Sequence, residues 1–270
     1  MFAQAETWER VKNNKVKVNT VMKICWAESL GNCSGKASRE HIVSRNLFEG
    51  ETVEVCGFSW CKNEEKEISL SSLTSKILCI KHNNELSEVD EAGGIAFKVL
   101  REMTRLSNVR EKMKPRIWHI VKHNINGLLL ERWFLKTLVN ISFNKEYPIG
   151  KLSHSDGMPT KELVEIIFGI RGFNNRAGLY MAAHVGQKID SCDKLIFSPL
   201  IKDNSFIIGG LFSFRGSRFL IFLEPEGPPE RLTGVGLPGD DWSNCQLNFH
   251  NEKIRLMQGK HLSQLVNIRW

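Results

Sequence analysis

The sequence has 270 residues, of which 41% are hydrophobic and 25% charged, and these values exclude a disordered or low-complexity chain. Its first residues are polar, and no stretch approaches the roughly 18 apolar residues of a membrane span. We therefore expect a cytoplasmic protein without a membrane partner. Seven cysteines, an odd number without a secretory signal, argue against a disulfide framework.

The net charge of +7 is concentrated in one segment. Residues 96–147 hold 11 lysines and arginines against 4 acidic residues, whereas residues 1–95 hold 12 against 14. Lysine and arginine gain affinity for polyanions because binding releases the counterions of the phosphates. The basic segment therefore predicts contact with nucleic acid, and a solvated helix face is the alternative.

The first predicted elements lie in residues 1–94. A helical pattern covers residues 4–13, residues 51–59 alternate as a strand does, and a short helix follows Cys79. We place the end of this segment at the glycine pair Gly93-Gly94.

Helical periodicity dominates residues 95–147. Apolar side chains recur at three- and four-residue spacing in residues 96–106 and again in residues 120–138, with Pro115 between the two runs. Residues 148–270 give mixed signals. A short helix is predicted at 160–173, and three compact apolar runs with turn residues between them predict strands at 195–197, 206–208 and 219–223.

Four residues of the first segment form a candidate zinc site. Cys25 and Cys33 stand on an early loop, and Cys79 and His82, with two residues between them, stand at a predicted helix start. Three thiolates and one imidazole are a ligand set that holds zinc tetrahedrally. The spacing of the second pair lets both side chains face one ion, although the first pair is more widely spaced than usual. Buried free cysteines beside a surface histidine are the alternative.

A resemblance to a known family lies beside these ligands. The Glu40-His41-Ile42 element, followed by the run from Leu78 to Asn83, resembles the HNH (ββα-metal) endonuclease family, in particular its zinc-clipped variety of the phage endonuclease VII type. The match covers residues 20–92. The family's central asparagine falls near Thr74-Ser75, and His82 replaces a fourth cysteine.

The resemblance implies a role for each residue. His41 would be the general base, while Glu40 and Asn83 would hold one catalytic Mg²⁺ or Mn²⁺ beside a structural zinc. Phosphodiester hydrolysis needs a group that deprotonates water near neutral pH and a cation for the oxygens of the phosphate. Because a regular strand turns consecutive side chains to opposite faces, this scheme requires irregular backbone at positions 40 and 41.

We therefore expect an α+β fold. A small zinc-stabilised ββα module at 1–94 would lead into a basic helical segment at 95–147 and a mixed α+β domain with antiparallel strands at 148–270. The expected function is metal-dependent cleavage of DNA, with RNA as a less favoured substrate, and analogy suggests a role in antiviral defence. The side chains expected to contact nucleic acid are Arg39, Arg45, Arg101, Arg105, Arg110, Lys112, Lys114 and Arg116.

Two other functions fit the same sequence. The chain would be a catalytically inactive, zinc-containing nucleic-acid-binding module if the HNH residues are degenerate, and the missing central asparagine favours that interpretation. Alternatively, residues 148–270 would carry an interaction or sensing function, through which the chain forms a homo-oligomer or binds a partner protein. No motif in that segment identifies a ligand.

Overall fold

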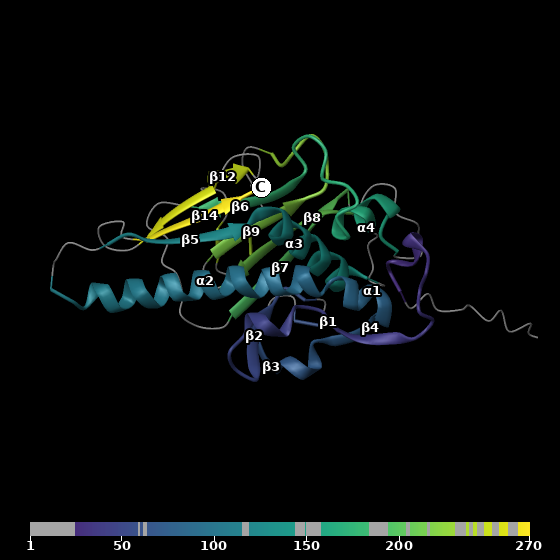
Figure 1. The fold of residues 1–270 in the computed structure, drawn as a ribbon, viewed down its shortest axis with the longest axis horizontal. Coiled ribbons are helices and arrows are strands. Elements are labelled where there is room, and N and C mark those ends of the chain that lie inside the picture. The colour runs from purple at the N-terminus through teal and green to yellow at the C-terminus, as the bar shows by residue number, and fades with distance from the viewer. Residues whose placement is uncertain are drawn as a thin grey trace, which may run out of the picture.

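The fold is of the mixed α+β class, as expected, with four α-helices and both antiparallel and mixed sheets in the described part of the chain (Figure 1). The computed structural model describes residues 25–58, 60–61, 64–114, 119–143, 149, 158–183, 194–203, 206–214 and 217–229, together with 236–237, 240–241, 246–249, 254–258 and 264–270. The helical pattern at residues 4–13 lies outside the described residues.

Two antiparallel strands and a short helix form the first structural unit. Strands β1 (Ala37–His41) and β4 (Thr74–Cys79) pair antiparallel, with a β-bulge between Ser38 and Glu40. Helix α1 (Ile80–Glu85) follows β4 directly. The chain between β1 and β4 forms a short 3₁₀ turn at Arg45–Leu47 and the antiparallel pair β2 (Thr52–Cys56) and β3 (Lys66–Ser69).

Helix α2 (Ser87–Glu111) runs through the glycine pair that we expected to end the first segment. A β-carbon at Gly93 would lie 2.5 Å from the indole of Trp133, and one at Gly94 would lie 2.5 Å from the amide of Asn46. The two glycines therefore allow close packing against α2, and no break in the fold occurs at residue 94.

The second helical run that we expected begins later than its sequence pattern suggests. Residues Val121–Asn126 form strand β5, and helix α3 (Gly127–Ser142) follows, with the side chain of Asn126 accepting a hydrogen bond from the Leu129 N–H. Strand β5 exists because it pairs in parallel with β14 (Gln264–Arg269), a partner that lies about 140 residues away in the sequence and that local periodicity cannot reveal.

The three apolar runs near the C-terminus are strands, as predicted. They lie in β7 (Lys194–Lys202), β8 (Phe206–Phe214) and β9 (Ser217–Phe222), and α4 (Lys161–Ile167) occupies part of the predicted helix at 160–173. The remaining strands are β6 (Gly178–Ala183), β10 (Gly236–Leu237), β11 (Asp240–Asp241), β12 (Gln246–Phe249) and β13 (Ile254–Gln258).

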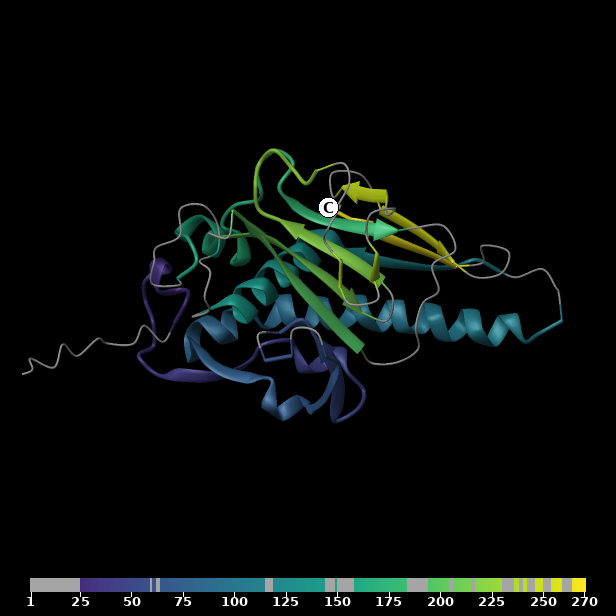
Figure 2. The same cartoon turned by 180° about the vertical axis from the view of Figure 1, so that it is seen from behind.

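One large sheet joins both ends of the chain. Its strand order is β12-β6-β9-β8-β7-β2-β3, and β2 pairs in parallel with β7 through the register Glu54–Lys194 to Cys56–Ile196. Seen from behind, the green strands β7–β9 cross in front of the helices, while the purple and blue N-terminal strands lie along their lower edge (Figure 2). No helix in the described part of the chain combines the length and apolar character needed to cross a bilayer.

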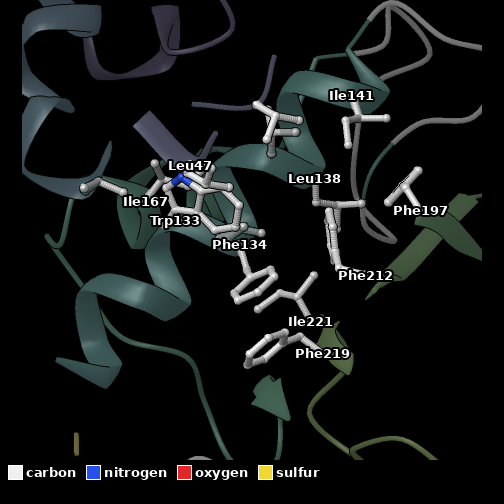
Figure 3. Close-up of a cluster of buried hydrophobic side chains, with 14 of the residues drawn as sticks. Leu47, Trp133, Phe134, Leu138, Ile141, Ile167, Phe197, Phe212, Phe219 and Ile221 are labelled. Atoms are coloured by element: carbon white, nitrogen blue, oxygen red, sulfur yellow. The ribbon is translucent and has the colours of Figure 1, made fainter. Parts of the chain in front are cut away.

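The core is centred on α3, which is buried on nearly every side. Thirteen of its 16 residues are buried, and its side chains Phe134 and Leu138 pack toward Phe212 and Phe219 of the sheet (Figure 3). Trp133 packs against Phe97 of α2. A helix with apolar residues all round is typical of a central core element. Its buried polar residues therefore need partners within the protein.

We expect Glu131 of α3 to make stability depend on pH. Burial raises the pKa of Glu131 to about 7 from 4.5, although its carboxylate accepts the Leu179 N–H at 2.8 Å. The folded state therefore keeps a proton that the unfolded chain has lost, so stability falls as pH rises from 4.5 to 7, by about 3 kcal/mol.

Urea denaturation of wild type and Glu131→Gln between pH 4.5 and 8 measures this effect. The difference in unfolding free energy between the two proteins should shift in favour of Glu131→Gln with rising pH. The exposed Glu111→Gln should show no such trend. A difference that is constant with pH for Glu131→Gln would contradict the buried, protonated carboxyl.

Candidate functional site

The four predicted zinc ligands meet in one cluster. The Sγ atoms of Cys25, Cys33 and Cys79 lie 3.3, 3.7 and 3.4 Å from Nδ1 of His82, and all four ligand atoms lie within 4.8 Å of one another. A tetrahedral zinc ion holds sulfur and nitrogen ligands about 3.5 Å apart, given Zn–S and Zn–N distances of about 2.3 and 2.0 Å. The cluster can therefore hold a zinc ion with little rearrangement.

Local structure explains how the second ligand pair is arranged. Cys79 is the last residue of β4 and the N-cap of α1, where its sulfur accepts the backbone N–H of His82. Burial alone would raise the pKa of Cys79, but hydrogen bonds from His82 and Ser34 lower it to about 7. A thiolate at this position is the form that binds zinc. His82 is buried and packs edge-on against Phe168.

Two further cysteines stay outside this cluster. Cys56 at the end of β2 and Cys61 are both buried thiols outside any disulfide, and Cys61 contacts the carbonyl of Val55. They pack in the core beside β2 and are not grouped with the zinc ligands.

Glu40 and His41 face opposite sides of β1. The bulge lies before them, between Ser38 and Glu40, and both residues then pair in regular register, Glu40 with Ser75 and His41 with Thr74. Consecutive side chains in regular register point to opposite faces. Glu40 is accordingly 4% exposed, whereas His41 is half-buried.

The carboxylate of Glu40 is engaged by a buried lysine of α3. Its Oε1 lies 2.5 Å from Nζ of Lys136, and Asn140 donates to the same oxygen at 3.4 Å. Burial raises the pKa of Glu40, and the charge of Lys136 opposes that shift. The side chain of Lys136 is only 2% exposed, so partners within the protein must stabilise its positive charge.

Lys136 also binds a second carboxylate, that of Asp90 in α2. Nζ lies 2.7 and 2.8 Å from the two oxygens of Asp90, and Ser44 donates to Asp90 at 2.5 Å. The indole of Trp133 donates to Ser44 at 2.8 Å. These contacts tie the chain that leaves β1 to both α2 and α3.

Asn83 has different surroundings. Its amide nitrogen donates to the Ser38 hydroxyl at 2.8 Å, on the part of β1 before the bulge. Within the described part of the chain, no hydrogen bond or ion pair joins Asn83 to either Glu40 or His41. The contacts therefore do not bring Glu40 and Asn83 together around one cation, and their roles as Mg²⁺ ligands stay predictions.

His41 lies among charged side chains. Burial and the charge of Arg45 lower the pKa of His41, Lys136 and Arg39 lower it further, and Asp90 opposes the shift. Nδ1 of His41 is buried and has no hydrogen-bond partner in the described part of the chain. In the charged imidazolium both ring nitrogens carry a hydrogen, so the buried Nδ1 would be an N–H donor without an acceptor. This environment therefore favours the neutral imidazole.

The cationic residues expected to contact nucleic acid differ in exposure. Arg39 and Lys114 are exposed, whereas Arg45 donates to the Phe48 carbonyl and pairs with Glu51, and Arg110 donates to the carbonyl of His119. Arg101 pairs with Glu49, and Arg105 pairs with Glu102. Lys112 is exposed at the end of α2, and Arg116 lies outside the described residues.

Sequence reasoning missed Lys136, Asp90 and Asn140, the residues that surround Glu40. One signal was present, because Lys136 interrupts the apolar run of α3. A lysine that is buried among apolar residues usually has an acidic partner, but the sequence alone does not say which one.

We expect the cluster to bind about one zinc ion per chain. Cys79→Ser and His82→Ala should lose most of that zinc and unfold at lower temperature, because a structural zinc contributes to folding. Cys61→Ser, which changes a buried cysteine outside the cluster, should keep its zinc. Elemental analysis and thermal unfolding measure both effects, and equal zinc content in all these variants would refute the ligand assignment.

Loss of Lys136 should destabilise the fold strongly. Lys136→Met leaves a buried carboxylate without its cation, which typically costs about 3–5 kcal/mol. The double variant Lys136→Met/Glu40→Gln should recover part of that loss, because it removes both charges. The exposed Lys98→Met should change stability by less than about 0.5 kcal/mol. Urea denaturation tests this, and additive effects of Lys136→Met and Glu40→Gln would show that the pair is not coupled.

Comparison with known proteins gives no relative from which a role can be transferred. No protein-family model, no curated protein and no solved structure matches this chain. The function is therefore argued from the chemistry of its own residues.

Proposed function

We propose that this protein is a nuclease that hydrolyses phosphodiester bonds of DNA, with His41 as the general base and the Cys₃His cluster as a structural zinc site. The observation that carries the proposal is the environment of His41, a half-buried imidazole among arginines at the end of a strand that the candidate zinc site adjoins. The resemblance to the HNH family at Glu40-His41-Ile42 and at Cys79 to Asn83 supports the same reaction.

The chemistry of His41 suits proton abstraction. A general base must be unprotonated at the working pH, and the lowered pKa of His41 keeps its imidazole neutral there. The imidazole would take a proton from water as the water oxygen attacks the phosphorus and the bond to the leaving oxygen breaks. The His41 side chain is only partly buried, as a base that meets water must be.

Two arginines beside His41 suit the phosphate. Arg39 is exposed on the bulged part of β1, and Arg45 begins the 3₁₀ turn that follows. Guanidinium groups bind phosphate oxygens in a bidentate manner and stabilise the negative charge of the reacting group. Their charges act on His41 as well.

Glu40 and Asn83 are engaged by other residues of the protein. The pair that the resemblance assigns to Mg²⁺ does not fit that ion as the side chains stand, because Glu40 is buried against Lys136 and Asn83 donates to Ser38. We therefore derive no step through Mg²⁺. The role of Glu40 that its contacts support is to hold the end of β1, and with it His41, against α3.

A second candidate is a zinc-containing nucleic-acid-binding module without cleavage. The burial of Glu40 favours it, because a carboxylate engaged by Lys136 is not available to an active-site cation. Cleavage itself distinguishes the two functions. Supercoiled plasmid should be nicked by the purified protein with Mg²⁺ or Mn²⁺, whereas the binding module would retard the plasmid and leave it intact.

The pH profile tests the role of His41. The cleavage rate should rise with pH through a pKa below 6.5 and become constant near neutral pH, because the neutral imidazole is the active form. His41→Ala should reduce the rate by about 10²–10⁴-fold, the usual contribution of a general base.

His119→Ala is the matched control, because His119 is exposed and lies outside the candidate site. It should retain the wild-type rate and pH profile. Circular dichroism of His41→Ala should match wild type, so that lost activity does not reflect lost structure. A His41→Ala protein that cleaves as fast as wild type would exclude His41 as the base.

A further inference from the structure

A basic groove follows one face of α2. It has a volume of about 540 Å³, and its lining includes four cationic residues, Lys98, Arg101, Arg105 and Lys112, against two acidic ones, Glu49 and Glu102. These cationic residues recur at intervals of three, four and seven, which places them along a single helix face.

The same helix face begins at Asp90, whose charge acts on the imidazole of His41. Asp90 and Gly94 precede Lys98 on this face at intervals of four residues. The chain that leaves β1 runs along it, because Ser44 bonds to Asp90, Asn46 to the Asp90 carbonyl and Arg101 to the Leu47 carbonyl. The groove therefore starts where the segment after β1 turns away from α2, near Glu49.

Only some of the cations in the groove are available to a ligand. Arg101 is 14% exposed and pairs with Glu49, while Arg105 makes two hydrogen bonds to Glu102 at 2.6 and 2.8 Å. Lys98 and Lys112 are exposed, and the ammonium group of neither has a hydrogen-bond or salt-bridge partner in the described part of the chain. The two lysines can release counterions of bound phosphates.

The opposite side of this part of α2 is covered. The side chain of Gln264 in β14 donates to the Met103 carbonyl and to the Ser107 hydroxyl. Figure 1 shows β5 and β14 along one side of α2, and on its other side, past β2 and β3, no helix or strand of the described residues lies over it. A long partner can therefore lie along the groove.

We infer that this groove binds the phosphate backbone of duplex DNA on one side of the bond that is cleaved at His41, an inference that rests on the proposed function. Single strands usually bind through aromatic stacking platforms beside the cationic groups, and none of the described residues that line this groove is aromatic. A groove of lysines and polar side chains without aromatic residues suits backbone contact with a duplex.

Helix geometry gives the extent of this contact. Lys98 and Lys112 lie 8 and 22 residues beyond Asp90, or about 12 and 33 Å along the helix axis at about 1.5 Å per residue. A duplex rises about 3.4 Å per base pair. The substrate must therefore extend about 4 to 10 base pairs from the cleaved bond on one side to reach both lysines.

Fluorescence anisotropy with a labelled 30-base-pair duplex tests the groove in the full-length protein. Lys98→Glu/Lys112→Glu should weaken binding about tenfold or more at low salt and reduce the slope of log Kd against log salt by about 2, since each lysine–phosphate contact contributes about 1. The control Lys122→Glu/Lys161→Glu makes the same charge change at exposed lysines outside the groove and should bind nearly as wild type does.

Duplex length provides a second measurement. Wild type should bind a duplex of about 20 base pairs or more much better than one of about 6, and the Lys98→Glu/Lys112→Glu protein should lose most of this preference. Equal binding by the groove variant and the control would overturn the inference. So would a single strand of equal length that binds wild type as tightly as the duplex does.

Cleavage assays distinguish a failure of the groove inference from a failure of the proposed nuclease function. Wild type that binds the duplex through these lysines without cutting it would refute the proposed nuclease and support the groove. Wild type that cuts plasmid while the groove variant cuts and binds equally well would keep the nuclease and overturn the groove.

Discussion

The buried ammonium of Lys136 is the interaction on which the arrangement of the candidate site depends. It lies within 2.8 Å of carboxylate oxygens from Glu40 in β1 and Asp90 in α2, and it belongs to α3, the central helix of the core. A buried charge is costly without partners. Strand β1 and helices α2 and α3 must therefore meet at this point for the chain to fold. His41 is the residue of β1 that follows Glu40.

A bound zinc ion and helix α3 would stabilise different parts of the candidate site. The Cys₃His cluster joins the loop at Cys25 and Cys33 to the start of α1, which a short helix and two strands alone would hold weakly. The end of β1, by contrast, is held by Lys136, Asn140 and Trp133 of α3. A zinc ion bound there would therefore hold the start of α1, whereas α3 holds the end of β1 that carries His41.

The sheet order makes the N-terminal and C-terminal parts of the chain interdependent. Because β2 pairs with β7, the strands between β1 and β4 complete a sheet whose other members come from residues beyond 178. The strand β5 likewise depends on β14. Both pairings join segments that we had assigned to separate units, so the candidate site is supported by residues from most of the chain rather than by the first 94 alone.

The residues of the candidate zinc site and several local elements are evident from the sequence alone. Cys79 and His82 were identifiable because two intervening residues at a helix start place both side chains on one ion, and the apolar runs of β7, β8 and β9 were identifiable because they are bounded by turn residues. These signals are local, so they do not require knowledge of distant contacts.

The environment of Glu40 and the identity of β5 depend on contacts between distant parts of the chain. Glu40 reads as a surface or metal-binding carboxylate until Lys136, 96 residues later, lies against it, and residues 121–126 read as a helix until β14 pairs with them. In both cases the deciding energy comes from a partner remote in sequence, an ion pair in one and a row of backbone hydrogen bonds in the other. Local residue periodicity does not identify such a partner.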